Sequence, residues 1–349
     1  MKLNLAASRQ RNFLLRDAPR LRLTTTAIPL AAICCLGGAG QMATSTTADA
    51  AESVVPITQP GSTDTDQAFL PPVSGFYGGV TILPINRNSR NYDSEGNPAP
   101  SERNIKLSVP VYAAALVYVY PFTLFGGHLA SSWVQPFEHI SYSIGGENQT
   151  AQTGLGNAYS DVVFWTKSLG LAGATPGHLP ISYGLSVAAG LAAIVPDGSY
   201  NRQNALNLGS DFWTLVPNIA ITYNTGERWS FGDNTQVSTR IFYGIPFENR
   251  QTHYTSGNIF DLDWSVTEQF GNLRIGAAGF YQAQVTDDTT GDGVPVPGGN
   301  RFHQAAAGPV IQYFVPSLRM YVKAKYVYTF YHKNFVNQQL LALTVAFKF

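Results

Sequence analysis

The last residues of the chain constrain its fold more than any other segment. The chain ends on an aromatic residue, Phe349, and apolar side chains recur at every second position before it. The parity of Phe349 is shared by Leu341, Leu343, Val345 and Phe347, whereas Gln338, Thr344 and Lys348 have the opposite parity. Because side chains on a strand alternate between faces, the pattern predicts one apolar face and one partly polar face. Such a strand suits a β-barrel with lipid outside and a watery lumen inside.

The amino terminus indicates export. Residues 1–22 carry one Lys and five Arg, and an apolar run follows from Ala27 to about Gly40. Ala48-Asp49-Ala50 then offers a small-residue cleavage site. Basic, apolar and cleavable regions in this order predict a secretory signal peptide over residues 1–50.

Both cysteines of the chain lie in the predicted signal peptide. Cys34 and Cys35 are the only cysteines, and both lie in the apolar run. A lipoprotein would need a small residue before the modified cysteine, but the large Ile33 precedes Cys34. The mature chain would begin near Ala51 and would therefore have no disulfide and no thiol chemistry.

Composition excludes several classes of protein. With 22 basic and 22 acidic residues in 349, the net charge is near zero, so there is no electrostatic case for binding nucleic acid. The 44% apolar content, with 18 Tyr and 20 Phe, argues against disorder. A helical membrane span needs about 20 consecutive apolar residues. The best candidate, 109–125, contains Pro110 and Pro121 and is rich in Val and Tyr, which favours a strand.

Alternation and turn signals predict twelve strands. They are expected at 74–83, 105–121, 128–142, 158–167, 181–195, 211–223, 229–245, 254–269, 273–286, 302–315, 318–331 and 337–349. Closing an even number of antiparallel strands pairs every backbone group and leaves no exposed sheet edge. The predicted fold class is therefore all-β: a transmembrane antiparallel up-and-down β-barrel of about 12 strands. A soluble two-sheet sandwich is the alternative.

The connections between these strands alternate in length. The odd-numbered ones are mostly long and polar, as at 86–104, 145–157, 196–210 and 287–300, and the even-numbered ones are mostly tight, as at 125–127, 224–226, 270–272 and 315–317. Outer-membrane barrels combine long outer loops with short periplasmic turns. The pattern places both mature termini in the periplasm and the protein in the bacterial outer membrane. The stretch 168–180 departs from it, because it is too long for a tight hairpin.

Two parts are expected in the mature chain. Residues 51–70 are predicted to be a flexible periplasmic N-terminal segment, and residues 71–349 are predicted to be the barrel. The stretch from Glu52 to Gln67 is also a candidate plug for the lumen, although it is short for that role.

Strand parity predicts which polar side chains face the lumen. An Arg or Lys on the lipid face at mid-membrane costs about 2–4 kcal/mol, so the polar parity is expected to face inward. The candidates for a lumen or substrate path are Arg240, Asp261, Asp263, Arg274, Gln282, Arg319, Tyr321, Lys323 and Lys325. We expect the two aspartates to pair with Arg240 and Arg274 across adjacent strands. The resulting ladder would fill and rigidify the lumen; the alternative is that it also lines a substrate path.

An ordered series of motifs runs through the barrel region. Its first part comprises Ser199-Tyr200 to Leu208-Gly209, Trp213-Thr214 and Pro217 to Tyr223. Its later parts are Glu248-Asn249, Thr252, Tyr254, Ser256-Gly257, Gly279-Phe280-Tyr281, Gln284-Val285-Thr286-Asp287-Asp288 and Gly308-Pro309. Through this series, about residues 71–349 resemble the outer-membrane proteins named for the meta-pathway of phenol degradation. A Gly-Leu-Gly-Asp element typical of that family stands here as Gly154-Leu155-Gly156-Asn157.

The resemblance implies an outer-membrane β-barrel that is encoded with aromatic catabolism and is proposed to carry hydrophobic or aromatic compounds inward. The family is named from gene context more than from mechanism, so the substrate does not transfer. The shared positions also have a structural explanation. Gly and Pro shape turns and bulges, while Asn, Thr and Ser satisfy the backbone of loops.

Signals for catalysis and metal binding are few. His139 and Ser141 share a strand face, as in outward-facing lipid hydrolases, but no third group that would orient them is identified. The loop that begins at Asp288 partly resembles a calcium loop, but Gly299 stands where an acidic twelfth residue is expected. The sequence therefore predicts no catalytic residue, no metal site and no cofactor.

The sequence thus predicts an outer-membrane channel or transporter for passive uptake of small hydrophobic or aromatic compounds. Its expected partners are outer-membrane lipid, those solutes and the barrel-assembly machinery, which would recognise the C-terminal strand ending at Phe349. The alternative is a structural or surface-interaction barrel with a closed lumen, and an outer-membrane lipid hydrolase is the third hypothesis. Because a small barrel is nearly filled by its own side chains, flux would need a narrow path or a lateral opening.

Overall fold

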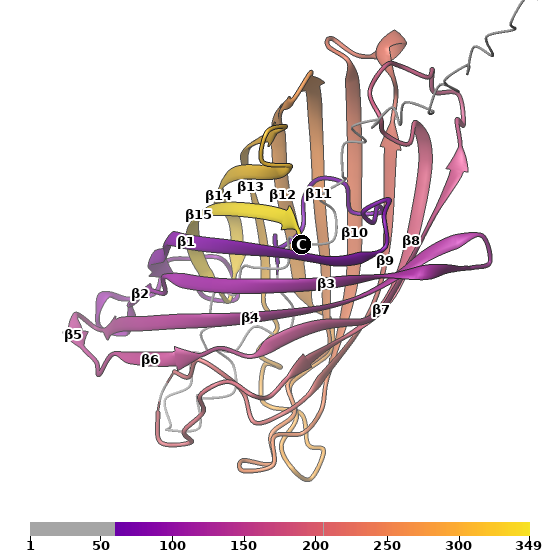
Figure 1. Ribbon diagram of the computed structural model, residues 1–349. Coiled ribbons are helices and arrows are strands. Elements are labelled where there is room, and N and C mark those ends of the chain that lie inside the picture. The colour runs from indigo at the N-terminus through magenta and orange to yellow at the C-terminus, as the bar shows by residue number, and fades with distance from the viewer. Residues whose placement is uncertain (1–59, 205) are drawn as a thin grey trace, which may run out of the picture.

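The computed structural model describes residues 60–204 and 206–349, which form one closed antiparallel β-barrel (Figure 1). The twelve long strands are β1 (Gly75–Asn91), β3 (Val111–Leu124), β4 (Gly127–Ile144), β7 (Ala158–Gly170), β8 (Gly184–Val195), β9 (Thr214–Asn224), β10 (Asn234–Pro246), β11 (Ile259–Phe270), β12 (Leu273–Gln284), β13 (His303–Val315), β14 (Met320–Lys333) and β15 (Val336–Lys348). The remaining elements are β2 (Ile105–Ser108), β5 (Glu147–Asn148), β6 (Gln152–Leu155), η2 (Ser101–Arg103) and η3 (Glu227–Trp229). The predicted twelve-stranded barrel is confirmed.

Pairing between the first and last strands closes the barrel. β1 runs antiparallel to β15 from Tyr77 opposite Lys348 to Asn91 opposite Val336. The C-terminus and the start of β1 therefore lie at the same end, where short turns join most strands (Figure 1). We call this the periplasmic end and the opposite one the extracellular end, following the loop lengths of outer-membrane barrels. Within the described residues, no helix is long and apolar enough to cross a membrane.

Several predicted strand boundaries were wrong. β10 and β11 begin five residues later than predicted, at Asn234 and Ile259, and the larger differences concern β1, β2 and β3. The strand predicted at 74–83 continues to Asn91, because Asn86, Asn88 and Asn91 are buried inward-facing residues rather than loop residues. Asn88 accepts a hydrogen bond from Leu107 N at 2.6 Å, which ties this extension to β2. The strand predicted at 105–121 is divided into β2 and β3 around Pro110, which has no backbone N–H to donate to a ladder.

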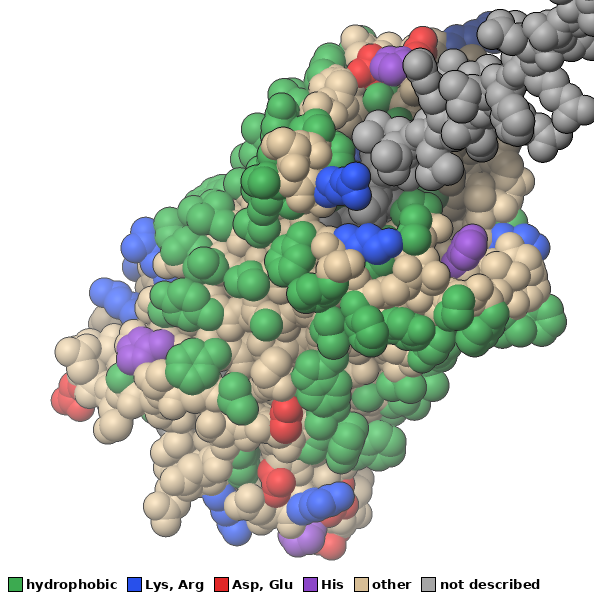
Figure 2. All heavy atoms as spheres, viewed as in Figure 1, with side chains coloured by type: hydrophobic (Ala, Val, Ile, Leu, Met, Phe, Trp, Pro, Cys, Tyr) green, Lys and Arg blue, Asp and Glu red, His purple; other side chains and the backbone are tan. Residues whose placement is uncertain are grey.

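The predicted alternation of faces is confirmed along the wall. On β14, Lys323, Lys325 and Thr329 are buried, whereas Tyr326 and Tyr328 are exposed. Hydrophobic side chains gather across the middle of the face drawn in Figure 2, over β1, β3 and β4. A row of aromatic rings in contact lies at the periplasmic end of the outer surface: Phe76, Tyr118, Tyr120 and Phe122. This distribution matches an apolar outer band with an aromatic girdle.

The long turn predicted at 168–180 lies between β7 and β8, and part of it docks on the neighbouring turn. His178 Nδ1 and a Glu227 carboxylate oxygen are 2.6 Å apart. The hydrogen bond with Glu227 raises the pKa of His178, and the same bond lowers the pKa of Glu227. Both side chains are exposed, so this pair joins two periplasmic turns without adding a buried charge to the wall.

The lipid-facing side chains of the wall give a quantitative prediction about membrane depth. Ile219 is 52% exposed near the centre of β9, and Val285 is 38% exposed just beyond the extracellular end of β12. We expect Ile219→Arg to lower the free energy of unfolding by about 2–4 kcal/mol and Val285→Arg to lower it by about 0–1 kcal/mol, because the cost of a charge depends on depth. Reversible urea unfolding in lipid vesicles measures both. Equal costs would contradict the predicted membrane position.

Candidate functional site

Residues 60–70, which we call the lumen segment, lie inside the barrel before β1. All of them are buried, and none belongs to a strand. The prediction of a flexible periplasmic segment over 51–70 was therefore wrong for these residues, since the polar inner wall holds them. The idea of a lumen plug agrees with their position. Residues 51–59 and the predicted signal peptide, 1–50, lie outside the described residues.

One anchor of the lumen segment is Asp64. Its two carboxylate oxygens lie 2.7 Å from Lys323 Nζ and 2.9 Å from Lys325 Nζ, and all three side chains are buried. Both lysines project inward from β14 because they share the parity opposite to the lipid-facing tyrosines. The arrangement places one carboxylate between two cations, so the wall carries an excess of positive charge that the lumen segment offsets.

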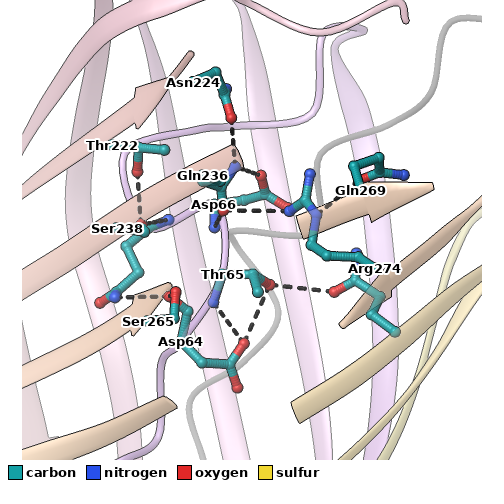
Figure 3. A network of polar contacts seen from close by, with 12 residues as sticks. Asp64, Thr65, Asp66, Thr222, Asn224, Gln236, Ser238, Ser265, Gln269 and Arg274 are labelled. Atoms are coloured by element: carbon teal, nitrogen blue, oxygen red, sulfur yellow. Dashed lines mark hydrogen bonds and ion pairs between the residues drawn. The ribbon is translucent and has the colours of Figure 1, made fainter. Parts of the chain in front are cut away.

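A second anchor is Asp66, which lies between β10 and β12 (Figure 3). A carboxylate oxygen of Asp66 is 2.7 Å from Arg274 Nη1, and both side chains are buried. Gln236 Nε2 donates to the other oxygen at 2.7 Å, while Asp66 N donates back to Gln236 Oε1 at 2.9 Å. Arg274 Nε also donates to Gln269 at 2.8 Å, which fixes the guanidinium from behind.

The backbone of the lumen segment is held by side chains of the wall. Asp263 on β11 accepts hydrogen bonds from Gly61 N at 2.6 Å and from Thr63 N at 2.8 Å. Ala68 N donates to Thr222 Oγ1 at 3.0 Å. A buried backbone that has no ladder partner must find such acceptors. Inward side chains of the wall supply partners to both kinds of backbone group: Gln67 N donates to Ser238 Oγ at 2.9 Å, and Ser265 Oγ donates to the carbonyl oxygen of Asp64 at 2.6 Å. Figure 3 shows Ser238 and Ser265 beside the segment.

A separate cluster surrounds Arg240, the largest fully buried side chain among the described residues. Its Nη2 atom is 2.6 Å from Asp161 Oδ1 on β7 and 2.8 Å from Asn218 Oδ1 on β9. The guanidinium carbon lies 4.4 Å from the centroid of the Phe164 ring and 4.7 Å from that of Phe242. The cation is thus paired, hydrogen-bonded and stacked, and it braces strands across the lumen.

The predicted pairing of Asp261 and Asp263 with Arg240 and Arg274 was wrong. Asp263 stands opposite Arg240 in the β10–β11 register, but it bonds the lumen segment instead. The two arginines take Asp161 and Asp66 as partners. Strand order alone suggested acids on neighbouring strands as partners. In the structure, the lumen segment brings Asp66 to Arg274, and β7 brings Asp161 to Arg240.

The other predicted lumen residues divide into two groups. Gln282 and Asp261 are buried and opposite each other in register, and Gln282 accepts a hydrogen bond from Gln304 at 2.7 Å. Tyr321 is buried and packs against Phe314, with ring centroids 4.8 Å apart. The assignment of Arg319 was wrong, because it is exposed in the periplasmic turn before β14, where its φ is +50°.

Many positions of the ordered motif series lie on two extracellular loops, between β10 and β11 and between β12 and β13, and hold these loops together. Asp288 accepts hydrogen bonds from Gly257 N at 2.7 Å and from the Tyr254 hydroxyl. Asn249 accepts from Gln251 N at 2.8 Å and from Thr252 N at 3.3 Å. Other motif positions serve the strands: Trp213, Pro217, Tyr223, Gly308 and Pro309. Ser256 is buried between the loops, and Asp287 forms an exposed ion pair with Arg301.

One glycine among them has a clear steric role. A Cβ atom at Gly308 would lie 2.0 Å from the carbonyl oxygen of Tyr326 on the neighbouring strand. Any larger residue would push β13 away from β14, so this position serves the packing of the wall.

The structure does not show the nucleophile–base arrangement that the hydrolase hypothesis requires. His139 and Ser141 share a face as predicted, but His139 Nδ1 contacts Thr153 Oγ1 at 2.6 Å. The Ser141 hydroxyl donates to the Ser108 carbonyl at 3.5 Å. The histidine ring is thus bonded to a threonine rather than to the candidate nucleophile. Within residues 60–204 and 206–349, no three His, Cys, Asp or Glu side chains form a group that could hold a metal ion.

Sequence reasoning missed Asp64, Asp66 and Asp161 as partners of the lumen cations. A signal was present, since the inward strands carry four candidate cations, Arg240, Arg274, Lys323 and Lys325, against the two acids Asp261 and Asp263. This imbalance indicates that acids from outside those strands complete the lumen. The polar run from Ser62 to Gln67 lies inside the stretch considered as a plug and supplies two of them.

A cavity of about 630 Å³ lies between the lumen segment and the periplasmic turns. We call it the vestibule; its lining includes Ala68, Phe69, Leu70, Leu179, Arg274, Phe314 and Tyr321. Aromatic and aliphatic side chains form one part of this surface, and polar and charged residues, among them Asp66, Lys167 and Gln312, form a comparable part. A pocket of this size and character can hold a small organic molecule.

Comparisons with known proteins agree with this architecture. A family model named for the MetA-pathway of phenol degradation matches residues 88–345. An outer-membrane channel from Pseudomonas putida superposes with a TM-score of 0.67 at 16% identity, over 82% of this chain and 98% of that chain. That likeness shows a shared fold. A search among curated proteins gave no match.

Two autotransporter domains overlap less closely. The transport unit of AIDA-I from Escherichia coli gives a TM-score of 0.43 at 10% identity, over 80% of this chain and 91% of that chain. The translocator domain of NalP from Neisseria meningitidis gives 0.40 at 8% identity, over 79% and 89%.

The contacts of the lumen segment predict its local stability. Arg274→Ala removes the ion pair with Asp66, and a hydrogen bond to a charged group contributes about 1.5–3 kcal/mol. We expect the amide hydrogens of residues 61–68 to exchange at least about tenfold faster in this variant, as hydrogen–deuterium exchange measures. The matched control is Arg240→Ala, because Asp161 and Asn218 belong to the wall. Equal acceleration in both variants would indicate general loosening of the barrel and contradict the prediction.

Proposed function

The chain belongs to the family named for the MetA-pathway of phenol degradation, and from that premise we propose that it is a channel for passive uptake of small hydrophobic or aromatic compounds. The closed barrel with its apolar outer face belongs in the bacterial outer membrane. The observation that carries the proposal is the way the lumen segment is attached. It lies across the lumen, yet side chains alone join it to the wall.

This attachment permits the segment to move while the wall stays intact. Each neighbouring pair of long strands is joined by a backbone ladder, including β1 and β15. Residues 61–68, by contrast, contact Asp263, Gln236, Thr222 and the lysines of β14 through hydrogen bonds and ion pairs that each involve a side chain. Water can replace such contacts one by one when the segment leaves. Displacement of the lumen segment therefore opens a path without breaking the barrel.

The size and lining of the vestibule suit a small aromatic solute. Its volume of about 630 Å³ falls within the range of small-molecule pockets. The rings of Phe314 and Tyr321 face it, 4.8 Å apart and inclined by 41°. Phe69 and Leu70 of the lumen segment complete the apolar part of the lining. A solute that binds there would contact both the wall and the segment that has to move.

The second candidate function is a structural or surface-interaction barrel whose lumen stays closed. The observation that favours it is the complete burial of residues 60–70 together with the Arg240 cluster. The two functions differ in whether solute passes at all, so a reversible lock of the lumen segment separates them.

A disulfide provides that lock. The contact of 3.0 Å between Ala68 N and Thr222 Oγ1 places the two residues side by side, so Ala68→Cys with Thr222→Cys is the pair to test for disulfide formation. In a background with Cys34→Ala and Cys35→Ala, we expect the oxidised protein to show the flux of protein-free liposomes. Reduction should restore uptake of labelled aromatic compounds to the level of the background protein.

The single-cysteine variants serve as controls, because they cannot form the lock. Uptake that continues in the oxidised double variant would show that passage does not need displacement of the lumen segment. Folded background protein that transports no compound of an aromatic and aliphatic panel would instead favour the closed barrel.

The vestibule gives a prediction about substrate preference. Tyr321 faces inward on β14, and Tyr328 faces lipid on the same strand. We expect Tyr321→Leu to lower the initial uptake rate of aromatic compounds about twofold to tenfold relative to aliphatic compounds of similar size, because an aromatic contact contributes about 0.5–1.5 kcal/mol. Tyr328→Leu should leave the ratio unchanged. A ratio that falls equally in both variants would argue against recognition in the vestibule.

A further inference from the structure

Two hollows on the outer surface lie apart from the lumen and share the strands β1 and β15. The first, of about 700 Å³, lies at the extracellular end, and its lining includes Ser89, Arg90, Tyr92, Asn104, Lys106 and Asn337. The second is a lipid-facing groove of about 390 Å³, lined by Val80, Ile82, Ile311, Ala324, Leu343 and Val345 among others. We call them the basic hollow and the apolar groove. Their positions on the same strands suggest that one ligand occupies both.

The basic hollow presents cations outward. Arg90 and Lys106 are exposed, and neither forms an ion pair with a described residue. Arg87 is exposed beside them and bonds Gln339 at 3.4 Å. The acids of the adjoining loops, Glu102 and Glu147, are not among the residues that line the hollow. In Figure 2, blue side chains lie over the end of the molecule where β2 is drawn in Figure 1.

The backbone of the basic hollow is built to hold this shape. The side-chain oxygen of Asn337 accepts hydrogen bonds from Ser89 N at 3.2 Å and from Arg90 N at 2.8 Å. These bonds occupy the point where the β1–β15 register shifts between Asn88 and Asn91. The bulge thus turns two successive residues of β1 toward the outer surface, and the exposed Arg90 is one of them.

The register relates Arg87 to aromatic side chains that are typical of a membrane interface. In register, Arg87 stands opposite Gln339, and Gln339 stands opposite Tyr328 on β14. Tyr328 is exposed, as are Tyr326 and Phe330 on the same strand. Exposed aromatic side chains of this kind mark the boundary between hydrocarbon and headgroups. A lipid phosphate in the extracellular leaflet would therefore meet Arg87, Arg90 and Lys106.

The spacing of the two hollows fits one lipid. Ile82 in the apolar groove and Arg87 are separated by five residues of β1, or roughly 16 Å along the strand at about 3.3 Å per residue. A strand tilt of about 35–45° reduces this length to about 12–13 Å of depth. The hydrocarbon of one leaflet is about 15 Å thick, which is half of a typical bilayer core. The small side chain of Ala324 leaves room in the groove floor for an acyl chain. A phosphate head at the cations would thus place its acyl chain along β1 and β15.

We propose that the basic hollow and the apolar groove together bind lipid A, the phosphorylated and acylated disaccharide of the extracellular leaflet. Clusters of Lys and Arg at a membrane surface attract anionic headgroups, and three cations suit the phosphates of this lipid. The site lies outside the barrel and does not depend on passage of a solute through the lumen.

The test measures binding of purified lipid A to the full-length detergent-solubilised protein by native mass spectrometry. Arg90→Glu with Lys106→Glu should weaken binding at least about tenfold, since each cation near an anionic surface contributes about tenfold or somewhat less. The control Arg319→Glu with Lys348→Glu reverses two exposed charges at the periplasmic end and should leave binding unchanged. Heat-modifiable gel mobility verifies that each variant is folded.

A second variant tests the acyl chain separately. Ala324→Phe fills the apolar groove and should weaken binding of lipid A several-fold, while binding of the deacylated phosphorylated headgroup stays as in the wild type. Lipid A that binds equally well to the Arg90/Lys106 variant would overturn the site. Phosphatidylglycerol that binds as tightly as lipid A would overturn the assignment to this lipid. Neither result affects the flux measurements, so disproof of the lipid A site would be distinguishable from disproof of the channel function.

Discussion

The requirement that every strand backbone be hydrogen-bonded within lipid determines the rest of this structure. Pairing of β1 with β15 removes the last free edge and closes the wall. Once the wall is closed, each strand has one face in lipid and one in the lumen, so polar side chains can be accommodated only inside. The charges of β10, β12 and β14 are consequently concentrated in a narrow space, and their partners become the next constraint on the fold.

The lumen segment follows from that second constraint. Lys323 and Lys325 project from one strand into the same space, where two unpaired ammonium groups would repel each other. Asp64 lies between them, and Asp66 does the same for Arg274. In return, the inward side chains of the wall satisfy the segment's backbone groups, which have no ladder partner. The wall and the segment therefore satisfy each other's buried polar groups.

The sequence predicted the wall better than its contents. Strand parity is a local property of the sequence. It therefore predicted which side chains of 341–349 and which tyrosines of β14 face lipid, without knowledge of the neighbouring strands. The extension of β1 to Asn91 was missed because buried asparagines resemble loop residues in sequence. The partners of Arg240 and Arg274 were missed because they depend on contacts 79 and 208 residues away in the chain. Such contacts are set by closure of the barrel and by insertion of the lumen segment, neither of which is visible in local periodicity.

The same polar chemistry that holds the lumen segment also limits how tightly it can be held. A buried ion pair gains Coulomb energy, but much of that gain is offset by the cost of removing both charges from water. When the segment leaves and water enters, Asp64, Lys323 and Lys325 recover their hydration, so the net cost of opening is smaller than the number of contacts suggests. An apolar plug of equal area would lose this compensation, because exposing its surface to water is unfavourable. A polar lumen segment in a barrel of this size is therefore suited to reversible displacement, with the closed state favoured by many individually weak contacts.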